Sequence, residues 1–324
     1  MSTQADASAI RHFLDLRDLD AATLRDILDV GRAVKAMQDK RRKPMHPAHP
    51  LAGRTLGLML SKPSTRTRLS FEVGMRQLGG DVSVLSPADM QIGRGESLAD
   101  TARVLSRFLD VLVVRTGETA MLTELVRWSS IPVVNGLTPD SHPVQILADI
   151  MTYEEHRGPV GGSHWAWVGD GNNVAVSLIE GAVRFGFSLT LATPESMKPR
   201  QEILDWAHAE GGEIRLVHDP VEAAQGADCI VTDTWTSMSD QESSARLSTL
   251  SPYQVNTALM QKAASNALFM HCLPAHIGEE VTEEVFESPA SVVFDEAENR
   301  LHAQKGLLLW VLGGENWRSY GKPV

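Results

Sequence analysis

Short apolar runs alternate with helical patterns along most of this chain, and this alternation constrains the fold more than any other feature of the sequence. It is typical of parallel βαβ units, in which a helix carries the chain back to the start of the sheet. We expect a helical pattern first, over Arg11–Lys40, and a last long helix over Ala297–Val311. The expected strands lie at Leu56–Leu60, Asp81–Leu85, Val111–Arg115, Pro132–Asn135, Trp165–Val168, Leu189–Ala192, Ile214–Val217, Cys229–Thr232, Leu268–His271 and Val292–Phe294.

The chain is long enough for two such sheets. Its 324 residues exceed what one hydrophobic core usually serves, so two domains of about 150 residues are expected. The segment 157–162 is rich in glycine and separates a helical pattern from the next strand. We therefore predict an α/β fold with two doubly wound parallel-sheet domains, over 1–155 and 156–300. The C-terminal helix, in 301–324, and the N-terminal helix are expected to pack on the first domain.

Composition disfavours several classes of function. A formal net charge of −11 argues against a nucleic-acid partner, because a phosphate backbone needs a basic face. There is no charged-then-apolar leader and no apolar stretch near the ~20 residues of a membrane span, so a cytoplasmic protein without a membrane partner is expected. Cys229 and Cys272 are too few for a disulfide framework or a thiolate zinc site. We expect no metal and no cofactor.

The segment Ser64–Arg68 combines hydroxyl groups, guanidinium groups and a predicted helix start. It follows the apolar run at 55–60 and precedes an irregular amphipathic pattern, so a bound phosphate would lie at a helix N-terminus. Ser64 is expected as the N-cap, and Arg66 can bind two oxygens at once. The segment by itself is equally compatible with a capped, solvated helix start.

Other polar side chains follow the expected strands, where ligands bind in open α/β sheets. Arg115 ends an apolar run, which suits either a ligand contact or a solvated strand end. His142 precedes Pro143, which favours a helix start, and Gln145 lies three residues after His142. Both side chains are compatible with capping, or with binding a carbonyl oxygen and an amide N–H.

The second half of the chain offers a glycine-containing turn over 169–173, between a strand and a helix. The dinucleotide pattern fails there, because Val174 occupies the third glycine position and no acidic residue closes the next strand. A small anionic or zwitterionic ligand is therefore expected, with Asn173 as its contact. Asp233 follows another strand and is compatible with either an N-cap or a partner for a ligand ammonium group.

His271 and Cys272 end a further strand and place an imidazole and a thiol at the same edge. A nucleophilic cysteine is disfavoured, because neighbours on a strand point to opposite faces and no separate base is evident. We expect instead a thiolate or thiol that contacts an incoming amine. Arg300 stands out in a helix that begins with acidic residues, and it could reach the same edge.

Together these motifs resemble the ornithine carbamoyltransferases of the aspartate/ornithine carbamoyltransferase family, in this order and over nearly the whole chain. The resemblance rests on Ser64–Arg68, His142-Pro143-x-Gln145, Asp233-x-x-x-Ser237-Met238, His271-Cys272-Leu273-Pro274 and Glu298-Asn299-Arg300. It implies a carbamoyl-phosphate domain, then an ornithine domain, and a homotrimer with active sites between subunits. It also implies direct attack of the ornithine δ-amine on carbamoyl phosphate, through a tetrahedral intermediate, to give citrulline and phosphate.

The resemblance also implies roles for individual residues. Carbamoyl phosphate would be bound by Ser64, Thr65, Arg66, Thr67, Gln91, Arg115, His142, Gln145, Cys272, Leu273 and Arg300. Ornithine would be bound by Asn173, Asp233, Ser237 and Met238. Within the first set the catalytic residues would be Arg66, Thr67, Arg115, His142, Cys272 and Arg300.

Two departures from the family pattern and several alternatives stay open at this point. Leu60-Ser61-Lys62 stands where the family usually has Phe-Glu-Lys, and Ser239 replaces a glycine in a loop that closes over ornithine. Putrescine is an alternative acceptor, and aspartate fits less well because its extra carboxylate needs a cation. A non-catalytic binding paralogue and a nucleotide-linked oxidoreductase are alternatives from other classes. Arginine biosynthesis is expected rather than arginine breakdown.

Overall fold

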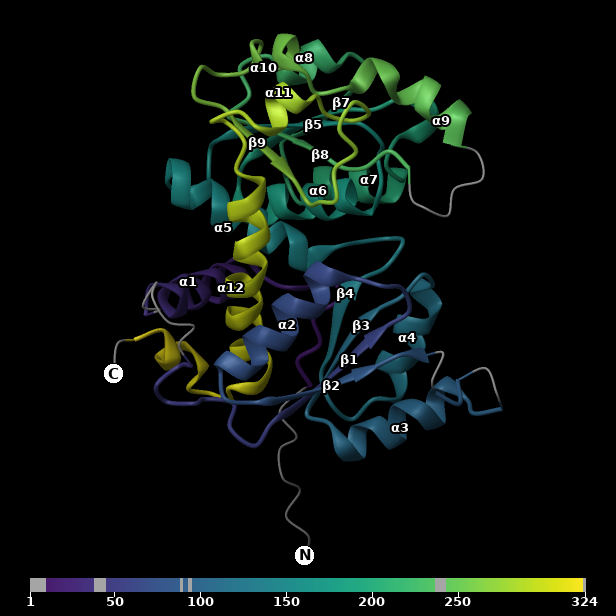
Figure 1. The fold of residues 1–324 in the computed structure, drawn as a ribbon, viewed down its shortest axis with the longest axis vertical. Helices are drawn as coiled ribbons and strands as arrows, with labels where there is room; N and C mark the ends of the chain where they lie inside the picture. Colours follow the sequence, from purple (N-terminus) through teal and green to yellow (C-terminus); the bar gives the residue numbers. More distant parts are fainter. Residues whose placement is uncertain (1–9, 38–44, 88–89, 93–94, 237–242, 323–324) are drawn as a thin grey trace, which may run out of the picture. The chain divides into compact units, whose positions relative to one another are not determined.

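The computed structural model describes residues 10–37, 45–87, 90–92, 95–236 and 243–322 (Figure 1). The chain forms two compact units. The first consists of Met1–Leu14, Asp26–Pro139 and Gln304–Val324, and the second of Asp15–Arg25 and Asp140–Ala303. No helix among the described residues has both the length and the apolar character that crossing a bilayer requires.

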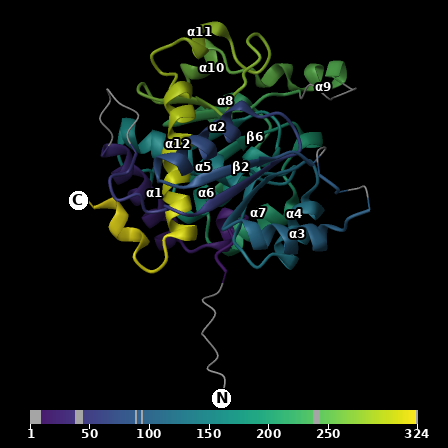
Figure 2. The same cartoon turned by 60° about the horizontal axis from the view of Figure 1, so that its bottom comes forward.

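The first unit contains a four-stranded parallel sheet with strand order β2-β1-β3-β4. Its strands are β1 (Thr55–Leu60), β2 (Asp81–Leu85), β3 (Val111–Arg115) and β4 (Val133–Leu137). Helix α2 (Thr65–Gln77) packs against β1 and β2. Helices α3 (Leu98–Phe108) and α4 (Thr119–Trp128) lie side by side (Figures 1 and 2). Apolar side chains of β3 and α4 form much of the core between them, including Leu112, Val114 and Leu122.

The second unit contains a five-stranded parallel sheet with strand order β7-β6-β5-β8-β9. Its strands are β5 (His164–Val168), β6 (Ser188–Ala192), β7 (Ile214–Val217), β8 (Cys229–Thr232) and β9 (Leu268–His271). The helices in 140–292 are α5 (Pro143–Arg157), α6 (Asn173–Phe185), α7 (Gln201–Ala209), α8 (Pro220–Ala224), α9 (Ser243–Leu250), α10 (Thr257–Met260) and α11 (Glu283–Phe286). Figure 1 shows α6 and α7 on one face of this sheet and α8 with α10 on the other.

Both sheets reverse their winding direction at one point, and this positions the functional residues. In the first sheet the reversal lies between β1 and β3, and in the second between β5 and β8. Open α/β sheets bind ligands at the carboxyl ends of the strands that flank such a reversal. In the first sheet, Ser64 follows β1 and Arg115 is the last residue of β3. In the second sheet, Asn172 follows β5 and Asp233 follows β8. The predicted fold of two parallel-sheet domains is confirmed.

Two expected elements differ from the structure. Val292–Phe294 is not a strand, because α12 (Val293–Leu312) begins there; only Ser291 forms a single bridge to Phe269. The apolar run is too short to compete with the helix that continues through it. The expected helix at 11–40 is a short 3₁₀ turn (Leu16–Asp18) and then α1 (Ala21–Ala36), because the Asp20 carboxylate accepts the Thr23 N–H and starts a new helix.

The two compact units divide between Pro139 and Asp140, earlier in the chain than the domain boundary expected between 155 and 156, which stays a prediction. Helix α5 therefore belongs to the second unit, where it packs against α6. The contact is close, since a Cβ atom on Gly181 would lie 2.6 Å from a methyl carbon of Ile146. The segment 158–162 lies between α5 and β5, within the second unit. Helix α12 contributes residues to both units.

Candidate active site

The segment after β1 forms the first turn of α2, as the sequence predicted. Ser64 occupies the N-cap position with extended backbone, but its side chain makes no capping hydrogen bond, contrary to the expected role of its hydroxyl. The first hydrogen bond of the helix joins the Arg68 N–H to the Ser64 carbonyl, at 3.2 Å. The amides of 65–67 thus have no acceptor within the helix. No acidic residue lies in this turn, so its positive dipole end is not neutralised locally.

Arg115 joins the end of β3 to this turn. Its Nη1 donates to the Oγ1 of the buried Thr67 at 2.9 Å. The described part of the chain places no hydrogen-bond or ion-pair partner against the side chains of Lys62 and Arg66. Cationic side chains at a helix N-terminus form a site suited to a phosphate. Gln91 lies exposed in the loop after β2, and no contact joins it to this turn among the described residues.

In the second unit, His142 and Gln145 begin α5. His142 occupies the N-cap position, Pro143 is the first helical residue as predicted, and the His142 N–H donates to Ser177 Oγ at 2.8 Å. The side chains of His142 and Gln145 are both almost fully buried. Burial of two polar side chains at a helix start supports a binding role more than a surface capping role.

Arg300, on α12, reaches Gln145. Its Nη1 donates to Gln145 Oε1 at 2.5 Å, and both side chains are buried. The Gln145 Nε2 donates to Asp149 Oδ1 and to Glu296 Oε1, each at 2.8 Å. The sequence analysis missed these two acids. Their spacing was a usable signal, since each lies one helical turn from a predicted site residue: Asp149 after Gln145, and Glu296 before Arg300.

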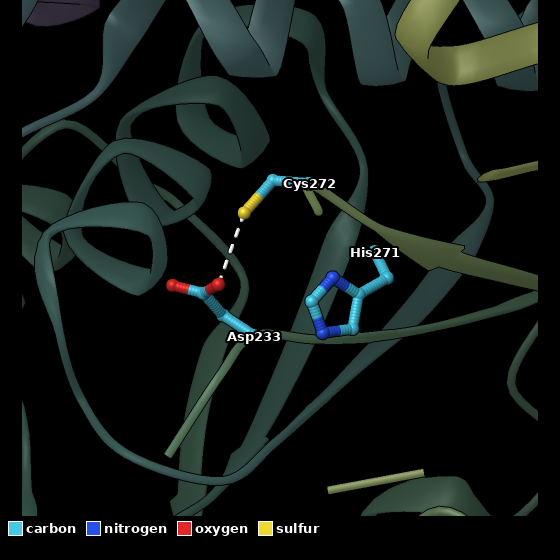
Figure 3. Close-up of side chains that lie close together, drawn as sticks. All are labelled: Asp233, His271 and Cys272. Atoms are coloured by element: carbon cyan, nitrogen blue, oxygen red, sulfur yellow. Dashed lines mark hydrogen bonds between the residues drawn. The ribbon is translucent and has the colours of Figure 1, made fainter. Parts of the chain in front are cut away.

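Cys272 and Asp233 meet at the ends of β9 and β8 (Figure 3). The Cys272 Sγ donates to Asp233 Oδ1 at 3.0 Å. Burial raises the pKa of the Cys272 thiol well above its ordinary value, and the negative charge of Asp233 raises this pKa further. Cys272 therefore stays a thiol at neutral pH, which disfavours nucleophilic catalysis.

Asn172 holds the second oxygen of Asp233, and the sequence analysis did not single it out. Its Nδ2 donates to Asp233 Oδ2 at 2.8 Å, while its Oδ1 accepts the N–H groups of Val174 and Ala175 and caps α6. Asn173, the predicted ligand contact, is the half-buried first residue of α6. Ser237 and Met238 lie outside the described residues, as does Ser239.

His271 fixes the backbone of the turn after β9. Its Nδ1 accepts the Leu273 N–H at 2.9 Å, so its Nε2 carries the hydrogen and donates to Glu280 Oε1 at 3.1 Å. Leu273 has a left-handed φ of 58°, a conformation that costs about 1–3 kcal/mol and needs such support.

Asp233, His271 and Cys272 offer metal-capable atoms that lie within 4.8 Å of one another (Figure 3). Both His271 nitrogens are already engaged in hydrogen bonds, so a metal ion at this cluster would have to displace them.

Comparisons with known proteins also divide the chain into two domains, with nearly all of α5 in the first of them. Residues 11–155 match the model of the aspartate/ornithine carbamoyltransferase carbamoyl-P binding domain, and residues 161–311 match the model of the Asp/Orn binding domain of the same family. The chain is 56% identical to an ornithine carbamoyltransferase of Nitrobacter winogradskyi, over 95% of this chain and 99% of the relative. A Brucella suis ornithine carbamoyltransferase is 53% identical over 95% of this chain and 97% of the relative.

Solved structures give the same result. The structure of ornithine carbamoyltransferase from Pyrococcus furiosus matches with a TM-score of 0.89 at 45% identity, and the match covers 94% of this chain and 97% of the other. An anabolic ornithine carbamoyltransferase from Campylobacter jejuni matches with a TM-score of 0.86 at 34% identity, over 93% of this chain and 99% of the other.

Proposed function

The chain belongs to the aspartate/ornithine carbamoyltransferase family, and from this premise we propose that it transfers the carbamoyl group of carbamoyl phosphate to the δ-amine of L-ornithine. The products are L-citrulline and phosphate. The observation that carries the proposal is the identity of 53–56% to several ornithine carbamoyltransferases over nearly the full length of both chains. Putrescine and aspartate are not favoured as acceptors, because these relatives are all named for ornithine.

The first unit would bind the phosphate group. We propose that the amides of the first turn of α2, with Ser64, Thr65 and Arg66, hold the phosphate oxygens, and that Arg115 bridges the phosphate and the carbamoyl oxygen. The bond from Arg115 to Thr67 supports this role, since it holds the guanidinium beside the turn. Lys62 and Arg66 have no ion-pair partner among the described residues, which leaves positive charge available for an anion. Gln91 is retained as a phosphate contact on the family resemblance alone.

The second unit would bind the carbamoyl group and ornithine. We propose that His142 donates to the carbamoyl oxygen and that Gln145, Arg300 and the Cys272–Leu273 backbone contact the rest of the group. Asp233 would pair with the ornithine ammonium group, and Asn173, Ser237 and Met238 would complete the contacts to ornithine. The half-buried Asp233, held by Asn172 and Cys272, supports this assignment because it presents a fixed carboxylate at a strand end.

The chemistry follows from charge. The ornithine δ-ammonium loses a proton, and the neutral amine then attacks the carbamoyl carbon. The new N–C bond forms as the carbonyl oxygen becomes an oxyanion, which Arg66, Thr67, Arg115 and His142 would stabilise. Collapse of this intermediate breaks the C–O bond to phosphate, which leaves with the bonding electrons, and the nitrogen loses its second proton. No covalent enzyme intermediate is needed.

An acceptor panel tests the proposal. Purified protein is incubated with carbamoyl phosphate and, in turn, ornithine, putrescine, N-acetylornithine and aspartate, and both the carbamoylated product and phosphate are measured. We expect product with ornithine only. Product with putrescine but not ornithine would change the acceptor, and phosphate release without product from any acceptor would reject the transferase function.

Arginine biosynthesis, a cytoplasmic location and a homotrimeric assembly are further parts of this proposal. They rest on the family resemblance, and one similar protein of known structure is described as anabolic. Growth of an arginine auxotroph that expresses the chain, cell fractionation and sedimentation of the purified protein test them separately.

A further inference from the structure

A closed hydrogen-bond network surrounds the Gln145 side chain. Both hydrogens of its Nε2 are used, one for Asp149 Oδ1 and one for Glu296 Oε1, each at 2.8 Å. Its Oε1 accepts from Arg300 Nη1 at 2.5 Å. All four side chains are at most 2% exposed. Helix α5 supplies Gln145 and Asp149, and α12 supplies Glu296 and Arg300.

This network permits one orientation of the Gln145 amide. Turning the amide over would place its oxygen against two carboxyl oxygens and its NH₂ group against a guanidinium that only donates. Both contacts would be unfavourable in a buried site, where unpaired polar groups cost about 1–3 kcal/mol each. The amide oxygen of Gln145 therefore points to the Arg300 side of the network.

The carboxyl groups of Asp149 and Glu296 lie close together, since both accept from the same Gln145 nitrogen. Burial raises the pKa of Asp149 to about 7, and it raises the pKa of Glu296 well above its ordinary value, with repulsion from Asp149 adding to the rise. Ionisation of one carboxyl group therefore disfavours ionisation of the other, while the positive charge of Arg300 favours the ionised form of each.

Glu296 also supports the turn after β9. Its second oxygen accepts the backbone N–H of His271 at 2.9 Å. His271 in turn fixes the Leu273 N–H, so this carboxyl group connects the Gln145 amide with the backbone that would contact the carbamoyl group. Both oxygens of Glu296 are thus required as acceptors.

Building on the proposed function, we propose that Asp149 and Glu296 are positioning residues that make Gln145 present a hydrogen-bond acceptor to the substrate. A carbamoyl group carries an NH₂ group that satisfies this acceptor. An acetyl group of nearly the same size carries a methyl group and leaves it unsatisfied. The pair therefore determines the preference for carbamoyl phosphate over other acyl phosphates, because a site built for hydrogen bonding rejects analogues that lack the donor.

Two isosteric variants separate this role from simple burial of charge. In Asp149→Asn the new amide oxygen can still accept from Gln145, which is the hydrogen bond that Asp149 makes to this network. In Glu296→Gln one acceptor oxygen becomes an NH₂ group, so either Gln145 or the His271 N–H loses its partner. Each variant removes one carboxyl group at nearly constant volume, but only the second removes an acceptor.

The test compares two stable phosphonates that differ at one group: phosphonoacetamide, which carries the amide, and 2-oxopropylphosphonate, which carries a methyl group instead. Their affinities are measured by calorimetry on the full-length protein. We expect the wild type to prefer the amide by about 10- to 100-fold. Asp149→Asn should keep this ratio within about 3-fold, and Glu296→Gln should lose most of it, while inorganic phosphate binds all three proteins alike.

An unchanged ratio in Glu296→Gln, or an equal loss in both variants, would overturn the proposal, as would a wild type that does not discriminate. If Glu296→Gln does not fold, Asp149→Ala replaces it, because alanine removes the acceptor that asparagine keeps, and its ratio should fall below that of Asp149→Asn. Citrulline formation by the wild type is measured in parallel. Discrimination without citrulline would reject the proposed function and leave the positioning role supported.

Discussion

The turn at the start of α2 in the first unit, which we propose binds phosphate, and the Gln145 network of the second unit treat charge in opposite ways. The turn at the start of α2 keeps positive charge unneutralised, with Arg66 half-buried and no carboxylate in the first helical turn. The network buries its charges completely and satisfies Gln145 with neighbours from two helices. Under the proposed function, the turn would attract a charged phosphate with uncompensated cations, whereas the network would hold Gln145 rigidly to recognise a neutral amide. Electrostatic attraction and geometric selection would thus belong to different regions.

The largest effect is expected where charge is uncompensated. Arg66→Ala should lower kcat/KM for carbamoyl phosphate by at least about 1,000-fold, because it removes a cation from the place where charge develops. The melting temperature should hardly change, since Arg66 supports no ion pair in the described fold. Arg76→Ala is the matched control: the same helix loses an exposed arginine that pairs with Glu72 at 3.0 Å, and activity should be retained. Near-normal turnover in Arg66→Ala would contradict the assignment of Arg66 to the proposed phosphate site.

A second substitution tests whether the second unit binds ornithine through a charged side chain. Asp233→Asn should raise the KM for ornithine by about 100-fold, because it removes the carboxylate that would pair with the ornithine ammonium group. The affinity for phosphonoacetamide should stay within about twofold. Steady-state kinetics and calorimetry give the two values. If both ligands weakened together, Asp233 would be a structural residue rather than an acceptor contact.

A third prediction concerns a buried acid in the second unit, which makes the free energy of unfolding depend on pH. Burial raises the pKa of Glu180 to about 8, and nearby Asp15 adds to the rise. Between pH ~4.5 and ~8 the folded chain therefore binds more protons than the unfolded chain, so the free energy of unfolding falls as the pH rises through this window, by up to about 1.4 kcal/mol per pH unit.

Glu180→Gln should remove that part of the pH dependence. It keeps an oxygen that can accept the N–H groups of Leu16 and Arg17, which both donate to one oxygen of Glu180. Urea unfolding of both proteins at pH 5, 6, 7 and 8 measures the difference. Parallel curves for the two proteins would show that Glu180 does not titrate in this range.

The smallest effects are expected from substitutions at two helix starts in the first unit. The Ser64 hydroxyl makes no capping bond, whereas the Ser97 Oγ accepts the Asp100 N–H at 3.0 Å. Ser97→Ala should therefore cost about 1 kcal/mol of stability, and Ser64→Ala less than about 0.5 kcal/mol. Phosphate affinity should respond in the opposite way, falling several-fold only for Ser64→Ala. Equal stability losses would mean that Ser64 is an ordinary cap.

The same contrast explains what could be predicted from the sequence. The turn at the start of α2 is built from adjacent residues. Its cap position, its cations and the strand before it could therefore all be recognised in one segment. The strand-end residues Arg115 and Asp233 were also visible, because parallel sheets gather their carboxyl ends. Asp149 and Glu296 were not identified, because their significance depends on two helices far apart in the chain that meet around Gln145. Asn172 was not predicted as a site residue, and its neighbour Asn173 was predicted instead. The two differ by one position at the start of α6, and that position decides which side chain caps the helix.

The two hydrogen-bonding roles of Asn172 restrict which residue types can occupy its position. Its oxygen caps α6 and its nitrogen holds Asp233, so one side chain must offer an acceptor and a donor in opposite directions. Aspartate is normally an equal cap, but here it would set one carboxylate against another. Serine is also a good cap, but it is too short to serve both partners. A position where helix starts usually tolerate four residue types is thereby restricted to one, and ornithine recognition, rather than helix stability, would impose that restriction.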